Sequence, residues 1–163
     1  MVRVPMVDVN AIGSGGGSIA WLDKAGGLKV GPHSAGSEPG PACYGRGGVE
    51  PTVTDASLVL GLIDPEYFAG GRFHLDKDKA YNIILEKVAT PLSLSVEEAA
   101  LGIHRVLNAQ MAEGIRFVSI KQGFDPRDFV LMGLGGGGPL HACELASELN
   151  IQKVLVPRQP GVL

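Results

Sequence analysis

The chain has 163 residues, 45% hydrophobic and 19% charged, which is the size and composition of one globular domain with a buried core. A net charge of -3 offers no basic surface for a phosphate backbone and argues against nucleic acid as a partner. No apolar run approaches the roughly 20 residues that span a bilayer, and the first residues lack a signal-peptide layout, so we expect no membrane partner and a cytoplasmic location.

The start of the chain predicts short strands joined by glycine turns. Residues 6–12 predict a strand, residues 13–17 a tight loop, residues 18–22 the returning strand, and residues 28–30 a further strand of an antiparallel meander. Residues 31–54 contain four prolines among many glycines, which predicts an irregular segment. An irregular segment of this length in a compact domain is usually functional.

Helices are predicted for the middle of the chain. Residues 55–62 favour a short helix and residues 77–90 another. Ser95 is a good N-cap for a long helix that runs to about Lys121. Its apolar residues recur every three or four positions and are expected to face a core: Val96, Ala99, Ala100, Ile103, Leu107, Met111, Ile115 and Val118.

The last third of the sequence predicts a β-loop-α-β unit. A strand over residues 129–134, a four-glycine turn, a helix over residues 140–149 and a strand over residues 153–156 follow one another. Such units favour parallel strands with a right-handed crossover. The predicted class is therefore α/β, with residues 1–163 as a single domain. Cys43 and Cys143 are expected to be free thiols.

Two glycine loops are candidates for ligand binding. The first comprises Gly13, Ser14, Gly15, Gly16, Gly17 and Ser18, whose amides and hydroxyls can cradle phosphate oxygens, with Asp8 nearby to hold a metal or a water. The alternative is a plain glycine hairpin. The second comprises Gly135, Gly136, Gly137 and Gly138, which open a helix and let a flat ligand such as adenine or ribose approach the backbone. It lacks the Walker and GxGxxG patterns, which excludes a Rossmann dehydrogenase.

Several single residues have two interpretations. Asp55 precedes a helix and is either a capping carboxylate or a site carboxylate. His141 is either a core histidine or, with Asp55 and Cys43, a ligand of a divalent metal, although no ligand spacing supports that set. Arg46 and Arg127 are either surface arginines or contacts for an oxyanion.

Several strings of this sequence resemble the hydantoinase A/5-oxoprolinase family. They include Ile12-Gly13-Ser14-Gly15-Gly16-Gly17-Ser18, Pro39-Gly40-Pro41-Ala42-Cys43-Tyr44-Gly45, Thr52-Val53-Thr54-Asp55-Ala56, Asp125-Pro126-Arg127-Asp128-Phe129 and Gly135-Gly136-Gly137-Gly138-Pro139-Leu140-His141-Ala142. The resemblance implies one lobe of an actin/sugar-kinase/Hsp70-like ATPase fold, related to ribonuclease H, with ATP and Mg²⁺ or another divalent metal as cofactors. The first glycine loop would then be the second phosphate loop of that fold, and the second would be its adenosine loop.

The resemblance also implies an activity and partners. Family members use ATP to phosphorylate a carbonyl or lactam oxygen, which activates a cyclic amide such as a hydantoin or 5-oxoproline for hydrolysis, or a ketone for carboxylation. Asp8 and Asp55 would be catalytic, and Asp55 with His141 would bind metal. The first phosphate loop of the fold, Asp-x-Gly-Gly-Thr, is absent, so the chain is expected to be a fragment, inactive alone, that needs a missing N-terminal lobe and a second family subunit or domain. A non-catalytic nucleotide-binding or assembly domain is the alternative. An excised lobe is also expected to self-associate.

Overall fold

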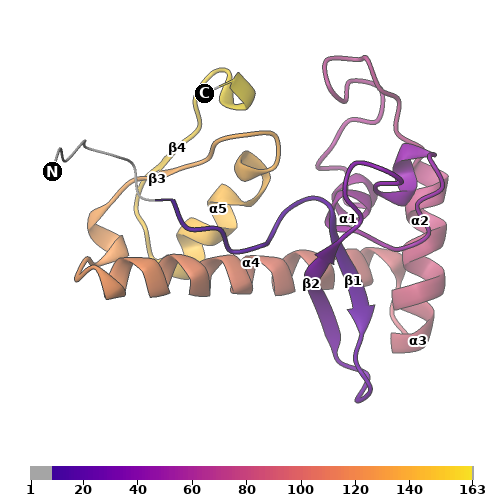
Figure 1. Ribbon diagram of the computed structural model, residues 1–163, viewed down its shortest axis with the longest axis horizontal. Helices are drawn as coiled ribbons and strands as arrows, with labels where there is room; N and C mark the ends of the chain where they lie inside the picture. Colours follow the sequence, from indigo (N-terminus) through magenta and orange to yellow (C-terminus); the bar gives the residue numbers. More distant parts are fainter. Residues whose placement is uncertain (1–8, 163) are drawn as a thin grey trace, which may run out of the picture.

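The computed structural model describes residues 9–162 and is organised around one long helix, α4 (Val96–Lys121). Figure 1 shows that the other elements pack in two groups along α4. The group at its N-terminal half is formed by the strands and helices of residues 18–92, and the group at its C-terminal half by those of residues 131–155. The long helix therefore connects the two packed groups.

The group at the N-terminal half of α4 contains an antiparallel hairpin. β1 (Ser18–Leu22) pairs with β2 (Leu28–Ser34), as the meander predicted, with Ala20 opposite Val30. Helix α1 (Val53–Val59) contacts β1, and α2 (Lys77–Ile84) packs against α1. Helix α2 continues through a π-helical turn, Leu85–Ala89, into α3 (Thr90–Leu92). The inner faces of all these elements meet α4 in one apolar core: Ala20, Val30, Val53, Ala56, Ile84, Val88, Ala89, Val96, Ala99, Ala100, Ile103 and Leu107.

Helix α4 begins where its sequence predicts. The Ser95 hydroxyl accepts a hydrogen bond from the Glu98 amide, and the Glu98 carboxylate accepts one from the Ser95 amide, which forms a capping box. These bonds hold the pKa of Glu98 below its usual value. Five of the eight predicted core positions, Val96 to Leu107, are buried, and the last three are half-buried. Of these three, Met111 and Ile115 pack against a second, smaller core.

The group at the C-terminal half of α4 is a β-α-β unit. β3 (Leu131–Met132) and β4 (Val154–Leu155) are parallel, and α5 (Gly138–Leu149) connects them, as the sequence predicts. Ala112 of α4 packs there in a second apolar cluster with Leu145, Ala146 and Leu149 of α5 and with Ile151, which follows that helix. Short 3-10 turns at Ala42–Tyr44, Pro126–Asp128 and Pro160–Val162 complete the chain.

Three element predictions differ from the structure. The strand predicted for residues 6–12 is wrong over residues 9–12, which form no regular structure, and the rest of it lies outside the described residues. The strand predicted for residues 129–134 shrinks to two residues, because each of the two parallel strands has a single partner. The helix predicted for residues 77–90 is interrupted by the π-helical turn. Among residues 9–162, no helix is both long and apolar enough to cross a bilayer.

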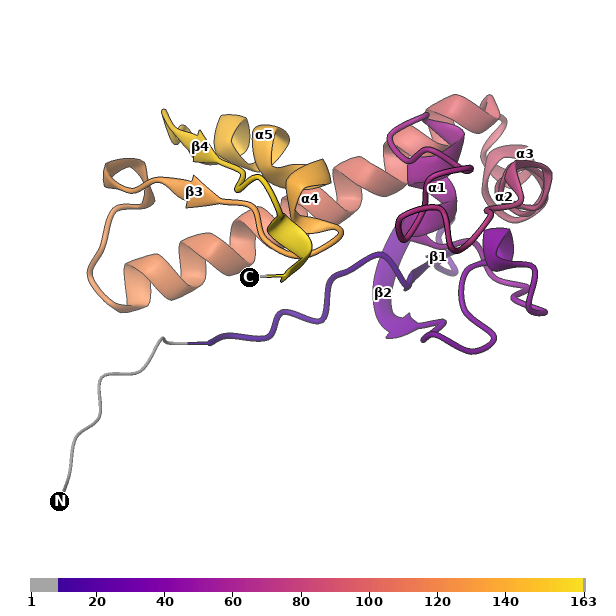
Figure 2. The same ribbon diagram turned by 90° about the horizontal axis from the view of Figure 1, so that it is seen from above.

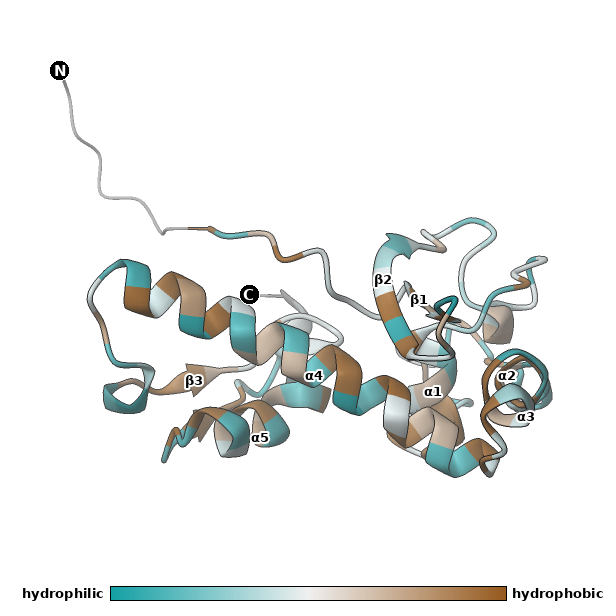
Figure 3. Cartoon of the chain, turned by 90° about the horizontal axis from the view of Figure 1, so that it is seen from below, coloured by the Kyte–Doolittle hydropathy of each residue, from teal (hydrophilic) through white to brown (hydrophobic). Residues whose placement is uncertain are grey.

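An exposed apolar patch lies at the C-terminal end of α4. Phe117 and Ile120 are 67% and 68% exposed, and Phe124 and Phe129, also exposed, stack edge to face nearby. Figure 3 shows hydrophobic residues, in brown, along this end of α4. Patches of this kind usually contact another protein surface.

We therefore expect the chain to self-associate at high concentration through this patch. Replacing Phe117 and Ile120 together by serine should shift sedimentation velocity profiles to monomer. Val49→Ser, at an exposed apolar residue outside the patch, is the control and should not change the profile. A wild-type chain that stays monomeric at high concentration would contradict the expectation.

Candidate functional site

The first glycine loop is bonded to α1 and to the end of β2. The Gly16 carbonyl accepts hydrogen bonds from the Thr54 amide (2.8 Å) and the Thr54 hydroxyl (2.9 Å). A Cβ atom at Gly16 would lie 2.7 Å from the Thr54 hydroxyl, and one at Gly17 would lie 2.7 Å from the Ser34 hydroxyl. A side chain at Gly16 or Gly17 would therefore displace a neighbouring hydroxyl, whereas Gly13 and Gly15 border open space.

The Ser18 side chain folds back inside this first loop. Its hydroxyl accepts a hydrogen bond from the Gly15 amide (3.1 Å), and the Ser18 amide donates to the Gly15 carbonyl (3.0 Å). Ser18 is buried, whereas Ser14 is half-buried and lines a cavity of about 400 Å³. The interpretation as a plain glycine hairpin therefore holds for one half of the loop, from Gly15 to Ser18, which is a structural turn. The other half, Gly13 and Ser14, borders a cavity.

The second glycine loop is open. The Gly135 amide donates to the Pro160 carbonyl (2.7 Å), and Gly135 has a φ of 76°, in the left-handed region that glycine favours. Cβ atoms at Gly136 or Gly137 would meet nothing within 4 Å. No side chain caps α5, which begins at Gly138. The loop therefore combines free volume with a helix N-terminus, where amides can bind anionic or polar groups.

Ile12 connects the two loops. This residue directly precedes the first loop, its side chain packs against Gly114 of α4, and it lines two neighbouring cavities. One, of about 400 Å³, includes Gly13 and Ser14; the other, of about 320 Å³, includes Gly133 and Gly138. Figures 1 and 2 show the segment that carries the first loop running past the second loop on the same side of α4. The cavity beside the first loop and the cavity beside the second loop therefore share Ile12 in their lining.

Asp55 is a buried anchor for the irregular segment. It is the third residue of α1, in a capping box with Thr52, and its side chain is fully buried. One carboxylate oxygen accepts from the Cys43 amide (2.8 Å); the other accepts from the Thr52 amide (2.9 Å), the Thr52 hydroxyl (2.7 Å) and the Ala42 amide (3.3 Å). The contacts match the capping interpretation and give the catalytic one no support. The other predicted catalytic carboxylate, Asp8, lies outside the described residues.

Cys43 and Arg46 lie in the same irregular segment. Cys43 is buried, and burial together with the neighbouring Asp55 carboxylate raises the pKa of its thiol far above the usual value, which makes it an unreactive thiol. Arg46 lies over the Phe73 ring, 4.6 Å from its centre. The irregular segment is therefore packed against α1 and α2.

His141 belongs to a buried polar network that joins three helices. Its Nδ1 contacts the Asn108 amide oxygen (2.7 Å), and the Asn108 nitrogen donates to Glu144. The His141 ring stacks on His104 at 5.1 Å between centres, and His104 Nε2 contacts the Ser57 hydroxyl (2.9 Å). Since that hydroxyl already donates to the Val53 carbonyl, His104 must donate through Nε2. Burial lowers the pKa of His104 to about 4 and that of His141 in the same direction, so both rings are neutral near pH 7.

The metal prediction for Asp55 and His141 finds no support in these contacts. The two side chains belong to different hydrogen-bond networks. Over residues 9–162, no three or more His, Cys, Asp or Glu side chains are placed to hold a metal ion. The stacked rings of His104 and His141 are inclined by only 26°, whereas a shared metal would have to lie in the plane of both rings.

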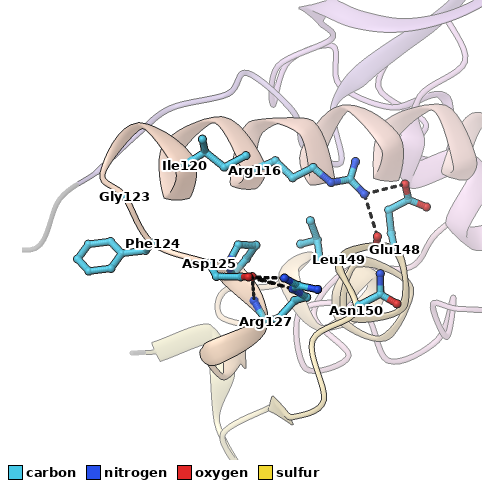
Figure 4. Close-up of a pocket in the computed structure, with 10 residues that line it drawn as sticks. Arg116, Ile120, Gly123, Phe124, Asp125, Arg127, Glu148, Leu149 and Asn150 are labelled. Carbon is cyan, nitrogen blue, oxygen red and sulfur yellow. Dashed lines mark hydrogen bonds and ion pairs between the residues drawn. The ribbon is translucent and has the colours of Figure 1, made fainter.

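A cavity larger than the two beside the loops lies at the C-terminal end of α4. It measures about 600 Å³ and is lined by Arg116, Arg127, Glu148 and apolar residues of the turn after α4 (Figure 4). Arg127 is held by the Asp125 carboxylate, and this ion pair lowers the pKa of Asp125 to about 2. Arg116 is paired with Glu113 and Glu148. Because carboxylates already neutralise both arginines, the oxyanion role considered for Arg127 has no support here.

Sequence reasoning missed the polar network, apart from His141. No functional role was predicted for Ser57, His104, Asn108 or Glu144, although all except Glu144 are buried. The available signal was spacing: His104 and Asn108 lie four residues apart, each next to a core position of α4, so both face the protein interior.

Comparison with known proteins shows close relatives along the whole chain. The family described as Hydantoinase/oxoprolinase matches residues 1–163. The chain is 52% identical to caprolactamase subunit alpha of Pseudomonas jessenii (96% of this chain, 23% of that one) and 47% identical to acetophenone carboxylase gamma subunit of Aromatoleum aromaticum (98% and 22%). It is 36% identical to 5-oxoprolinase 1 of Arabidopsis thaliana (100% and 14%). The chain thus spans less than a quarter of these relatives.

Solved structures share the fold. The crystal structure of ATP-dependent caprolactamase from Pseudomonas jessenii matches with a TM-score of 0.88 and 51% identity, over 98% of this chain and 23% of that one. The nucleotide-free structure of acetone carboxylase matches with a TM-score of 0.83 and 33% identity, over 91% and 21%. These matches confirm the predicted fold class, an α/β lobe of an ATPase-like fold. The chain belongs to the hydantoinase/oxoprolinase family, as its motifs predict.

Proposed function

We propose that this chain provides two nucleotide-contacting loops of an ATP-dependent enzyme that acts on a cyclic amide, either a lactam, a hydantoin or 5-oxoproline. The observation that carries the proposal is the open second loop: Gly136 and Gly137 have free volume where a side chain would stand, at the uncapped start of α5. The first loop lies on the same side of α4, with Gly13 and Gly15 open. The residues therefore fit a nucleotide.

Each loop has a separate role in the proposal. The amides at Gly136 and Gly137 would contact the adenosine, and the open half of the first loop, with Ser14, would contact phosphate oxygens. ATP supplies the phosphoryl group that activates the amide carbonyl. Its Mg²⁺ would arrive with the phosphates, since the described residues show no built metal site. Completing the site requires further parts of a longer protein, as the relatives' lengths suggest.

Ketone carboxylation is the second candidate. Acetophenone carboxylase gamma subunit is almost as similar to this chain as caprolactamase subunit alpha is, at 47% against 52% identity. The nucleotide loops would serve both reactions, because a ketone oxygen and a lactam oxygen are activated in the same way. Assay of the complete enzyme with a lactam, a hydantoin, 5-oxoproline and a ketone would distinguish the two.

Calorimetric titration of this chain with Mg·ATP, Mg·ADP and Mg·AMP tests the nucleotide site. Alanine at both Gly136 and Gly137 should weaken binding at least about tenfold without unfolding the chain, because the added Cβ atoms fill ligand space and meet no protein atom within 4 Å. Valine at the exposed hairpin residue Ala25 is the control. Unchanged affinity in the double variant would rule out an adenosine contact at the second loop.

A further inference from the structure

The stacked pair His104 and His141 lies at the junction of the two packed groups along α4. His104 is on α4 and bonds Ser57 of α1, whereas His141 is on α5 and bonds Asn108 of α4. Both rings are almost completely buried, and their centres are 5.1 Å apart. The ring contact is therefore a direct polar link between α1 and α5 through the middle of the protein.

From His104 the link continues to the first glycine loop. Ser57 lies one turn after Thr54 on α1, and Thr54 holds the Gly16 carbonyl through both its amide and its hydroxyl. A shift of α1 relative to α4 therefore moves Thr54, which donates both hydrogen bonds to the Gly16 carbonyl. The first loop follows the position of α1.

From His141 the link continues to the second glycine loop. His141 is in the first turn of α5, three residues after Gly138, where the loop ends. The Asn108 side chain bonds α5 at two points: at His141 in the first turn and at Glu144 in the second turn. The second loop therefore follows the position of the first turn of α5 against α4.

We propose that His104 and His141 are positioning residues that fix the two glycine loops relative to one another, a proposal that rests on the nucleotide site proposed above. The rings touch neither loop. They act through Ser57 and Thr54 on one side and through the first turn of α5 on the other. Because a packed interior transmits displacement, a change at one end of the network should reach the loop at the other end.

Glycine amide shifts in ¹H–¹⁵N spectra of the chain without nucleotide test the link. Ser57→Ala removes the partner of His104, and it should change the amide shifts of Gly136 and Gly137, on the far side of the stacked rings. Asn108→Ala removes the partner of His141, and it should change the amide shift of Gly16, at the other end of the network. Ser119→Ala is the matched control, because its hydroxyl also donates to the carbonyl four residues earlier, at the same 2.8 Å.

The same variants should weaken Mg·ADP binding by about five- to tenfold, at the low end of coupling between linked sites. His104→Gln, which keeps a donor for Ser57, should bind more tightly than His104→Leu, which does not. If Ser57→Ala and Asn108→Ala each disturb only the adjacent loop, the positioning role is overturned. If the wild-type chain does not bind Mg·ADP, the proposed nucleotide site fails, whereas the amide shifts still decide whether the loops are linked.

Discussion

Replacing Asp55 with alanine should lower the free energy of unfolding by about 3 to 5 kcal/mol. The substitution leaves three buried amides, those of Ala42, Cys43 and Thr52, without their acceptor, and each unsatisfied buried donor costs about 1 to 3 kcal/mol. It also releases the irregular segment from the start of α1. Urea denaturation followed by circular dichroism measures the change.

Asp76→Ala is the matched control for this prediction. Asp76 caps α2 through the Lys79 amide (3.0 Å), but it is partly exposed, so its loss should cost only about 1 kcal/mol. A loss below about 1 kcal/mol for Asp55→Ala would show that Asp55 does not anchor the fold. That result would favour the alternative interpretation, in which Asp55 is a carboxylate of the functional site.

Acid should destabilise the chain through His104. Its pKa is about 4 in the folded protein and 6.5 as the ordinary value, so the unfolded chain binds the proton more tightly. The contribution of the neutral ring is complete above about pH 6.5 and is lost as the pH falls towards 4. The shift corresponds to a loss of roughly 3 kcal/mol over this window. His141, whose pKa is also lowered by burial, acts in the same direction.

Urea denaturation at intervals between pH 7 and pH 4 measures this dependence. His104→Gln cannot gain a proton, so its stability should fall less over the window than that of the wild type, although Asp125 and other paired carboxylates still contribute at the acid end. His33→Gln, at an exposed position, is the control variant. Parallel curves for the wild type and His104→Gln would refute the role of His104.

Local patterns predicted most of the fold. The capping serine predicted where α4 begins, and its apolar period predicted how far it extends. Glycine turns between strand-like residues predicted the β1–β2 hairpin. The strand prediction for residues 6–12 is wrong over residues 9–12, and the strand predicted for residues 129–134 is too long, because the formation and length of a strand depend on its partners, which no local pattern contains. The π-helical turn after α2 left no signal either.

The candidate site was predictable only in part. Clustered glycines pointed to both loops, but sequence does not distinguish Gly16 and Gly17, which pack against hydroxyls, from Gly136 and Gly137, which border open space. Asp55 was recognised as a capping or site residue, and its four hydrogen bonds come from a segment twelve residues away as well as from Thr52. The histidine network joins three helices, and its contacts arise only when those helices pack.

Titration of the glycine-labelled chain with Mg·ADP, followed in ¹H–¹⁵N spectra, tests the shared nucleotide site most directly. The account predicts that the amide signals of Gly13 and Gly15 and those of Gly136 and Gly137 move together and give the same Kd, because one ligand contacts both loops. Movement of one loop alone, or of neither, would contradict a shared site.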